Sequence, residues 1–261
     1  MSIEYVEVSI DYLPVELEGF RVAHLSDFHG RRLDPAGRII DQILAANPHV
    51  IALTGDYVDK HGSDLEGVIP FVKALTEIAP VYAVSGNHDY WTDWRTIADT
   101  LRASGIDVLE NEHRIVEYQG AELVLAGVND PFTGHADLSV ALPAGSDSPT
   151  ILLAHSPTWF EARKHYVVGN VPSNSQKTDE ALSRVALTLA GHTHGGQIKL
   201  PFIGALSNAS GRIFPRDFIQ GLTHEDTGWL YISRGIGFTL LPVRFLSRAQ
   251  VTVLTLRAKR E

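Results

Sequence analysis

Metal-ligand side chains recur along this chain in five short blocks, and each block follows an apolar run. The candidate ligands in these blocks are Asp27, His29, Asp56, Asn87, His155, His192 and His194. The preceding runs, at residues 22–25, 50–53, 81–84, 151–154 and 185–190, are typical of short buried strands. Open α/β sheets bind ligands at the carboxyl ends of their strands, so the blocks predict one shared site at one sheet edge.

The donor types indicate which metals such a site would take. Residues two apart on a strand point to the same face, so Asp27 and His29 can aim at one site, as can His192 and His194. A mixture of carboxylate and imidazole suits Mn, Fe or Zn better than Ca or Mg, which prefer all-oxygen shells. Seven ligands are too many for one tetrahedral zinc ion but suit two metal ions that share a bridging carboxylate.

The composition of the 261-residue chain excludes several classes of protein. Hydrophobic residues make up 44% and the mean hydropathy is -0.01, as in a globular protein with a sizeable core. The absence of cysteine excludes disulfides, thiolate zinc sites and thiol nucleophiles. A formal net charge of -9 argues against a nucleic-acid-binding surface, which would be basic.

No segment is recognisable as a membrane span or an export signal. The sequence holds no run of 18 apolar residues, and its first residues lack a basic region followed by an apolar one. We therefore expect a cytoplasmic protein without a transmembrane segment. Peripheral membrane contact through apolar loops is the alternative.

The elements that must position these ligands alternate between strand and helix in the first hundred residues. An alternating pattern over residues 3–10 predicts an opening strand. Helical spacing of apolar residues predicts helices at 35–46, after an Asp34 N-cap, at 64–78 and at 92–103. The order βαβαβα requires parallel strands with right-handed crossovers.

The second half of the chain is richer in strands. Short strands are expected at residues 108–109, 113–118, 122–128, 197–200, 228–233 and 249–256. They indicate a second sheet packed on the first, and no linker divides the chain, so we expect a single domain over residues 1–261. Residues 167–178 have loop composition and are expected to form an excursion that serves as a lid or narrows the substrate range.

The five blocks together resemble the calcineurin-like metallophosphoesterases. That family's pattern is D-x-H, G-D-x-x-D, G-N-H-[DE], a lone histidine and G-H-x-H, and all five occur here in order between Asp27 and His194. Residues 191–197 (GHTHGGQ) and 233–237 (SRGIG) resemble one branch, the YkuE- and YaeI-like bacterial phosphohydrolases. The resemblance implies a four-layer α/β/β/α sandwich of two packed mixed sheets flanked by helices.

The resemblance also implies a role for each residue. The first metal ion would be held by Asp27, His29, Asp56 and His194, and the second by Asp56, Asn87, His155 and His192. Two divalent ions are expected, with Mn favoured and Fe or Zn as alternatives. A hydroxide bridging the metals would attack phosphorus in line, His88 would assist as a catalytic residue, and Asp89 would orient His88 or a neighbour.

Some nearby residues have open roles. Asp59 is expected to cap a turn or to brace His29. Arg31, with its neighbour Arg32, and Arg234 could hold a phosphate oxygen, because the guanidinium group matches phosphate geometry; solvated loop positions are the alternative. Ser156 stands where many relatives in the branch carry an acidic or amide residue, which predicts altered bonding around His155.

The functional hypothesis is a phosphoester hydrolase, with a phosphodiester as the expected substrate. Apolar residues at 200–203 and 238–243 are explained most simply as core. If they are exposed beside the metals, they would form a wall for an acyl chain, and the alternative substrate is then a lipid-linked phosphodiester or pyrophosphate at a membrane surface. The partner is accordingly a phosphoester small molecule or a lipid head group.

Two other classes of protein fit these residues less well than a phosphoesterase does. A non-catalytic metal-binding scaffold is disfavoured because every ligand position is filled and His88 is present. A metal-dependent amidohydrolase is disfavoured because its His-x-His lies on the first strand of a TIM barrel, whereas here that motif comes last.

Overall fold

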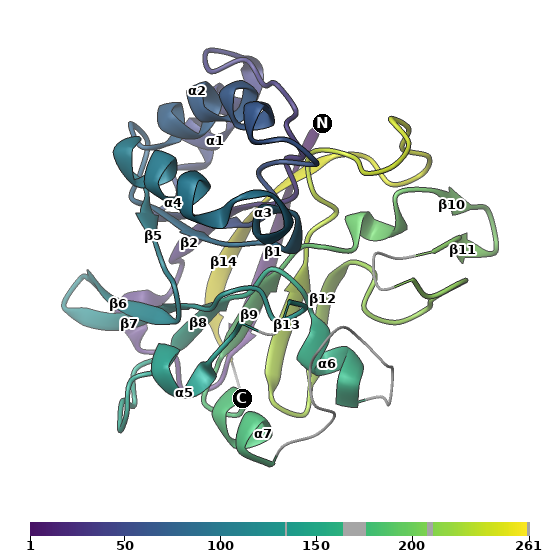
Figure 1. The fold of residues 1–261 in the computed structure, drawn as a ribbon. Helices are drawn as coiled ribbons and strands as arrows, with labels where there is room; N and C mark the ends of the chain where they lie inside the picture. The colour runs from purple at the N-terminus through teal and green to yellow at the C-terminus, as the bar shows by residue number, and fades with distance from the viewer. Residues whose placement is uncertain (134, 164–175, 208–210, 260–261) are drawn as a thin grey trace.

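Two six-stranded sheets pack face to face between two layers of helices (Figure 1). The computed structural model describes residues 1–133, 135–163, 176–207 and 211–259. Both sheets contain parallel and antiparallel pairs, so the predicted α/β/β/α sandwich of two mixed sheets is confirmed.

The first sheet has the strand order β1-β14-β2-β3-β4-β5. Its strands are β1 (Ser2–Ile10), β2 (Arg21–Leu25), β3 (Val50–Thr54), β4 (Val81–Val84), β5 (Asp107–Val108) and β14 (Gln250–Ala258). Strands β2 to β5 are parallel, as the βαβαβα pattern predicts, and β14 inserts antiparallel to β2 and parallel to β1. The carboxyl ends of β2, β3 and β4 therefore meet at one edge.

The second sheet has the strand order β12-β13-β9-β8-β7-β6. Its strands are β6 (Glu112–Tyr118), β7 (Ala121–Gly127), β8 (Thr150–Leu153), β9 (Leu187–Ala190), β12 (Gly221–Glu225) and β13 (Gly228–Ile232). Strands β7, β8, β9 and β13 are parallel, and a small hairpin of β10 (Lys199–Leu200) and β11 (Gly204–Ala205) stands apart.

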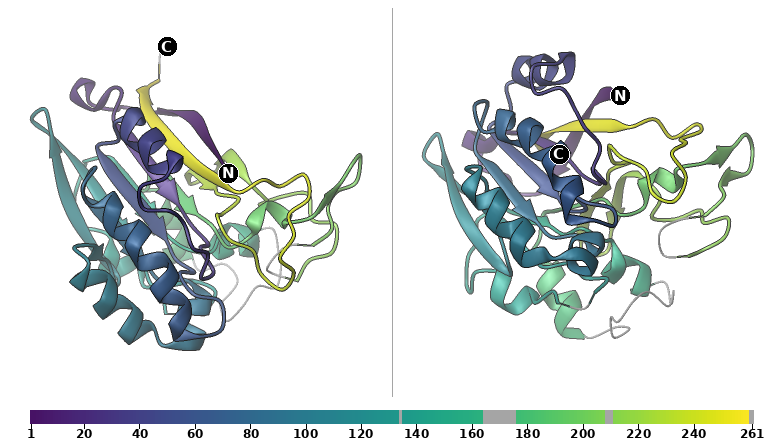
Figure 2. Two further views of the ribbon diagram at one scale, coloured as in Figure 1. Left: turned by 90° about the horizontal axis from the view of Figure 1, so that it is seen from above. Right: turned by 45° about the horizontal axis from the view of Figure 1, so that its top comes forward.

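Helices cover the outer face of each sheet, as Figure 2 shows from two sides. Helices α1 (Arg38–Ala46), α2 (Leu65–Leu75), α3 (Asn87–Thr92) and α4 (Trp94–Ala103) come from the first half of the chain. Helices α5 (Leu138–Ala141), α6 (Thr158–Arg163) and α7 (Gln176–Leu182) come from the second. Short 3-10 turns lie at Val15–Leu17, Gly62–Asp64 and His194–Gly196.

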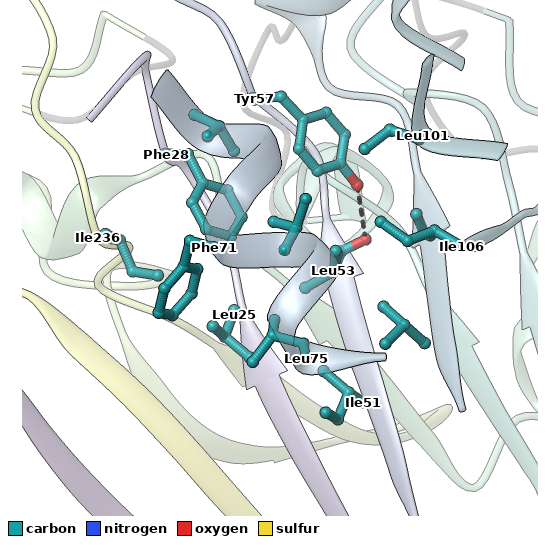
Figure 3. Packing of buried hydrophobic residues seen from close by; sticks show 14 of the residues in the cluster. Leu25, Phe28, Ile51, Leu53, Tyr57, Phe71, Leu75, Leu101, Ile106 and Ile236 are labelled. Carbon is teal, nitrogen blue, oxygen red and sulfur yellow. Dashed lines mark hydrogen bonds between the residues drawn. The ribbon is translucent and has the colours of Figure 1, made fainter. Parts of the chain in front are cut away.

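The alternating side chains of β3 show how both faces of a sheet are filled. Ile51 and Leu53 point into the cluster under α1, α2 and α4, which includes Phe71 (Figure 3). Val50 and Ala52 point the other way, into the cluster between the two sheets. A strand buried on both faces reads as a continuous apolar run, which is why the sequence pattern located it correctly.

Several predicted boundaries differ from the structure. The helix expected at 92–103 is two helices, α3 and α4, separated at Asp93, whose carboxylate accepts a hydrogen bond from the Thr96 N–H and begins α4. The helix expected from residue 35 begins at Arg38, because the Asp34 carboxylate accepts from the Ala36 N–H and forms a turn instead of an N-cap. The helix expected at 64–78 spans Leu65–Leu75.

The excursion expected at 167–178 lies mostly outside the described residues. Of this segment only residues 176–178 are described, and they form the start of α7. Within the parts of the chain that the structure covers, no helix is both long and apolar enough to cross a bilayer.

Removing a large core side chain tests the packing under α2. Phe71 is fully buried, so Phe71→Ala should lower the free energy of unfolding by about 3–5 kcal/mol through lost burial and a residual cavity. Urea denaturation followed by circular dichroism measures this difference. The matched control is Tyr12→Ala at a fully exposed position, where a change within about 0.5 kcal/mol is expected.

Candidate metal centre

The seven candidate ligands all lie just beyond strand ends and are buried. Asp27 and His29 follow β2, Asp56 follows β3, and Asn87 is the first residue of α3 after β4. The second sheet contributes one ligand after β8, His155, and two after β9, His192 and His194. The site therefore straddles the seam between the two sheets, with ligands from five parallel strands.

Five of these ligands have left-handed backbone conformations, which are uncommon outside glycine. The positive φ angles are 55° at Asp27, 46° at His29, 55° at Asp56, 70° at His192 and 54° at His194. Such angles turn the chain sharply and are found where surrounding structure enforces them, often at functional sites. Gly191 allows the segment before His192 to approach Asp27 closely. A Cβ at this position would collide with the Ser26 hydroxyl and the Asp27 carboxylate.

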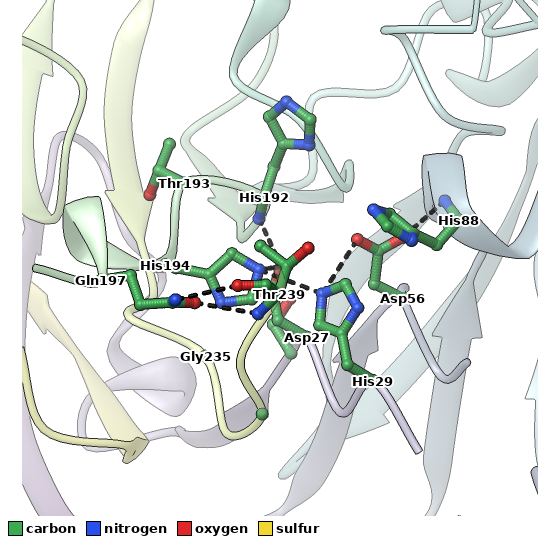
Figure 4. A network of polar contacts seen from close by, with 12 residues as sticks. Asp27, His29, Asp56, His88, His192, Thr193, His194, Gln197, Gly235 and Thr239 are labelled. Carbon is green, nitrogen blue, oxygen red and sulfur yellow. Dashed lines mark hydrogen bonds and ion pairs between the residues drawn. The ribbon is translucent and has the colours of Figure 1, made fainter. Parts of the chain in front are cut away.

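One group of contacts gathers around His29 (Figure 4). Its Nε2 lies 3.4 Å from Asp56 Oδ2 and 3.0 Å from His194 Nε2. The same His194 nitrogen lies 3.6 Å from Asp27 Oδ1. These four residues are the set that the family resemblance implies for the first metal ion.

A second group of contacts shares the same oxygen of Asp56. His155 Nε2 lies 3.2 Å from Asp56 Oδ2 and 3.1 Å from Asn87 Oδ1. Asn87 Oδ1 also lies 2.8 Å from His192 Nδ1. The structure thus brings together the residues assigned to the second metal ion, and Asp56 is common to both groups.

The chemistry of this cluster fits divalent cations. Asp27 Oδ2 and His192 Nε2 are buried without a hydrogen-bond partner among the described residues. Carboxylate oxygens and imidazole nitrogens from Asp27, His29 and His194 lie within 4.8 Å of one another, as do those of Asp27, Asp56 and His155. Burying acceptors this close together is costly without a positive charge between them, so the donor set suits metal ions.

The charges of the site are shifted by burial and by each other. Burial opposes the charged form of Asp56, but attraction from His155 and His29 outweighs it and lowers the pKa of Asp56. For His192, burial together with repulsion from His155 lowers the pKa to about 3. Burial and the neighbouring His29 likewise depress the pKa of His194. Both rings are therefore neutral near pH 7, which is the form that binds metals.

Asp89 holds the backbone around the site and does not touch the His88 ring. Its carboxylate accepts hydrogen bonds from the N–H groups of Asp56 at 2.8 Å, Tyr57 at 2.9 Å and Gly86 at 2.8 Å. Asp89 is expected to orient either His88 or a neighbouring residue. The structure shows contacts with neighbouring residues and none with the His88 ring. Burial and the Asp56 charge raise the pKa of Asp89 to about 7, against the effect of these donors.

His88 presents its ring to the cavity beside the ligands. Its backbone N–H donates to Asp56 Oδ1 at 2.9 Å, and its Nδ1 bonds the Asp59 carbonyl at 2.7 Å. Asp59 also braces His29, because its Oδ1 lies 3.4 Å from His29 Nδ1. A ring fixed through Nδ1 leaves Nε2 free to meet a substrate.

The candidate phosphate-binding arginines are tied to the protein backbone. Arg31 donates to the Ile236 carbonyl at 2.6 Å. Arg234 donates to the Arg248 carbonyl and pairs with Glu4 at 3.1 Å. Neither side chain is among the residues that line the cavity at the ligands. Both bond other parts of the protein, so these contacts support neither phosphate binding nor the alternative of a solvated loop position.

Two residues near the ligands were missed by the sequence reasoning. Arg244 donates to Nδ1 of His194 at 3.1 Å and to the carbonyls of Gly237, His194 and Ser247. No spacing pattern points to it, since it comes from a loop 50 residues further along the chain. Asp130 is buried with Oδ1 unpartnered among described residues, and its place just after β7 was a signal that could have found it.

A cavity of about 530 Å³ opens beside the ligands. It is lined by Asp56, Asn87, His88, His192 and His194 and by the apolar side chains of Trp91, Phe132, Ile198, Leu206, Leu240 and Leu241. Trp91 lies against the His88 ring and Phe132 against the His192 ring, with ring centroids 5.0 Å and 5.1 Å apart. A larger cavity of about 770 Å³ lies under the β10–β11 hairpin and holds none of the seven ligands.

The apolar segments at 200–203 and 238–243 are not core, which corrects the simpler expectation. Phe202, Ile203, Leu240, Leu241 and Val243 are exposed. Local hydropathy does not separate a buried segment from an apolar surface loop, and only the tertiary structure decides between them.

Comparison with known proteins agrees with this arrangement. Residues 20–196 match the family model described as Calcineurin-like phosphoesterase. The Bacillus subtilis protein named uncharacterized metallophosphoesterase YkuE is 30% identical over 258 residues, which cover 94% of this chain and 82% of that protein. Phosphodiesterase YaeI of Escherichia coli is 30% identical over 244 residues, covering 91% of this chain and 82% of its own.

A solved structure shares the fold at low sequence identity. The sulfate thiohydrolase SoxB of Thermus thermophilus superposes with a TM-score of 0.51 at 13% identity. The match covers 92% of this chain and 57% of that one. This likeness concerns the architecture of the packed sheets and not the chemistry.

Replacing Asp89 tests its role as a backbone anchor. In Asp89→Asn, the amide nitrogen would face N–H donors and leave at least one of them unpaired, so the free energy of unfolding should fall by about 2 kcal/mol. Urea denaturation measures this loss. The control is the exposed Asp99→Asn, and an equal, small change in both variants would contradict the assignment.

Metal binding should depend on pH in a defined direction. Burial opposes a charge on His155, but attraction from Asp56 outweighs it and raises its pKa well above the usual value, so the metal-free ring carries a proton near pH 7. Coordination must release this proton, and affinity for Mn²⁺ should therefore increase as pH rises towards that pKa. Titration calorimetry in PIPES and HEPES measures the released protons; a binding enthalpy independent of the buffer would count against this view.

Proposed function

This chain belongs to the calcineurin-like phosphoesterase family of hydrolases, and we propose that it cleaves phosphodiesters at a pair of divalent metal ions. The observation that carries the proposal is the convergence of seven buried ligands into two groups that share the Asp56 carboxylate. Two groups with one common carboxylate are the arrangement expected of a two-metal phosphoesterase.

The residues would hold the ions in two sets. Asp27, His29, Asp56 and His194 would bind one, and Asp56, Asn87, His155 and His192 the other. The mixture of nitrogen and oxygen donors fits Mn²⁺, with Fe and Zn as the alternatives. When bound, such ions lower the pKa of water and neutralise the charge of phosphate oxygens.

The chain itself positions the reacting groups. His155 donates Nδ1–H to the Thr54 carbonyl at 2.6 Å, which directs Nε2 to the site. His88 is held through Nδ1 and presents Nε2 to the cavity, where it can stabilise a transferring phosphoryl group or protonate a leaving oxygen. Both rings are thereby oriented before a substrate arrives.

A diester is favoured over a monoester by the shape of the cavity. Besides the candidate ligands, the cavity of about 530 Å³ is lined by the apolar side chains of Trp91, Phe132, Leu240 and Leu241. This leaves space for a second ester group on phosphorus. The relative YaeI is named a phosphodiesterase, which agrees with this choice.

A second candidate function is hydrolysis of a lipid-linked phosphodiester at a membrane surface. The apolar lining of the cavity favours it, because a hydrocarbon group would contact Leu240 and Leu241. A non-catalytic scaffold is not favoured, because all seven ligands and His88 are in place.

Substitutions at Asp56 and His88 test the mechanism. With Mn²⁺ added, Asp56→Ala should reduce hydrolysis of bis(p-nitrophenyl) phosphate to background, because both ligand groups lose their shared carboxylate. His88→Ala should lower kcat by about 10²–10⁴-fold while metal content, measured by elemental analysis, stays unchanged. The ratio of activity on bis(p-nitrophenyl) phosphate to activity on p-nitrophenyl phosphate measures the preference for diesters over monoesters.

The control for both variants is the exposed His61→Ala, for which full activity is expected. Equal turnover in wild type and Asp56→Ala would rule out the two-metal mechanism. Loss of bound metal in His88→Ala would instead move this residue from a catalytic role to a ligand role.

A further inference from the structure

Exposed apolar side chains gather in three loop segments next to the metal centre. Of the 18 large exposed hydrophobic residues in the described chain, ten fall at 202–203, 213–214 and 238–246. Leu240 is 88% exposed and Phe202 is fully exposed. We call these ten residues the apolar face. Large exposed apolar patches on a protein surface mark sites of interaction with other proteins or with membranes.

The loops that carry the apolar face are joined to each other and to the site. Figure 2 shows the β10–β11 hairpin, in green, and the yellow loop before β14 projecting side by side. The Gln197 side chain, three residues after His194, bonds the backbone of Thr239 at 2.9 Å and Leu241 at 3.0 Å. The Lys199 N–H donates to the Phe245 carbonyl at 2.9 Å.

The charge around the apolar face is opposite to that of the whole chain. Residues 197–220 and 234–249 contain six basic residues and one acidic residue, a net charge of +5 in a chain of net charge -9. Two of the basic residues pair with glutamates elsewhere in the chain, and the region stays positive with these pairs included. Arg216 and Arg248 are exposed and form no ion pair with any described residue.

We propose that the apolar face docks on an anionic phospholipid bilayer. Apolar side chains at loop tips can enter the acyl boundary, and the surrounding arginines can meet anionic head groups. Exposed phenylalanines such as Phe202 and Phe214 suit the region between head groups and hydrocarbon. A second copy of the chain fits less well, because a symmetric dimer would place two positive faces against each other.

Docking in this way would open the metal centre towards the head groups. Leu240 and Leu241 belong both to the apolar face and to the cavity that His88 and four of the candidate ligands line. The substrate class is then a phosphodiester that carries an acyl chain. This second step rests on the proposed function, whereas the docking itself does not.

Vesicle co-sedimentation tests the docking surface. The wild-type protein should bind vesicles of equal parts phosphatidylglycerol and phosphatidylcholine, and bind pure phosphatidylcholine more weakly. The double variant Phe202→Ser and Phe214→Ser should lower the vesicle partition coefficient about tenfold or more, because two aromatic side chains no longer leave water. Arg216→Gln with Arg248→Gln should remove most of the preference for the anionic vesicles.

The matched control is Tyr12→Ser, a fully exposed aromatic position just after β1, at the sheet edge away from the ligands. It should bind vesicles like the wild type. None of these variants touches a metal ligand, so all should hydrolyse bis(p-nitrophenyl) phosphate normally. No vesicle binding by the wild type, or undiminished binding by the phenylalanine double variant, would overturn the proposal. A dimer in gel filtration that the same variant dissociates would replace the bilayer with a second copy.

A separate experiment tests whether the substrate carries an acyl chain. Relative kcat/KM for p-nitrophenyl octyl phosphate over p-nitrophenyl methyl phosphate should exceed one and fall in Leu240→Ser. An unchanged ratio would refute the acyl-chain substrate while leaving docking intact. Absence of any phosphodiesterase activity together with normal vesicle binding would refute the proposed function alone.

Discussion

The Asp56 carboxylate is the group on which the rest of the site depends. Its Oδ1 accepts the His88 N–H at the start of α3, which leaves Oδ2 to face His29 and His155. A buried carboxylate needs compensating charge, and here that comes from imidazoles contributed by both sheets. The two sheets are therefore joined at this edge by attraction between charged groups as well as by packing. The strand ends must be held accurately for these groups to meet.

The convergence of the seven candidate ligands could be predicted from sequence because each of them follows a strand whose apolar run is visible locally. Strands such as β3 and β9 are buried on both faces, so their continuous apolar runs reveal them. Right-handed crossovers then bring their ends to one edge without further information. What the pattern does not contain is the left-handed backbone at residues such as Asp27 and His192, because that conformation is enforced by neighbouring segments and not by residue type.

The contacts by which residues distant in sequence hold the site could not be predicted either, for the same reason. Asp89 follows His88 directly, yet its carboxylate faces the backbone N–H groups of Asp56 and Tyr57, which lie more than 30 residues earlier. The apolar residues at 238–243 were assigned to the core because hydropathy records composition and not exposure. Both features depend on how distant segments meet, and a single sequence carries little information on that.

The loop before β14 links the surface of the protein to its ligands. It places Leu240 and Leu241 at the cavity, and a few residues later Arg244 reaches His194. Because Arg244 donates to His194 Nδ1, the neutral ring carries its proton on Nε2, the atom that faces His29. If His194 held a metal ion through Nε2, this proton would have to leave that nitrogen and the contact with Arg244 would have to change. The segment that contributes Leu240 and Leu241 to the cavity therefore also contacts His194, a candidate ligand of the first group.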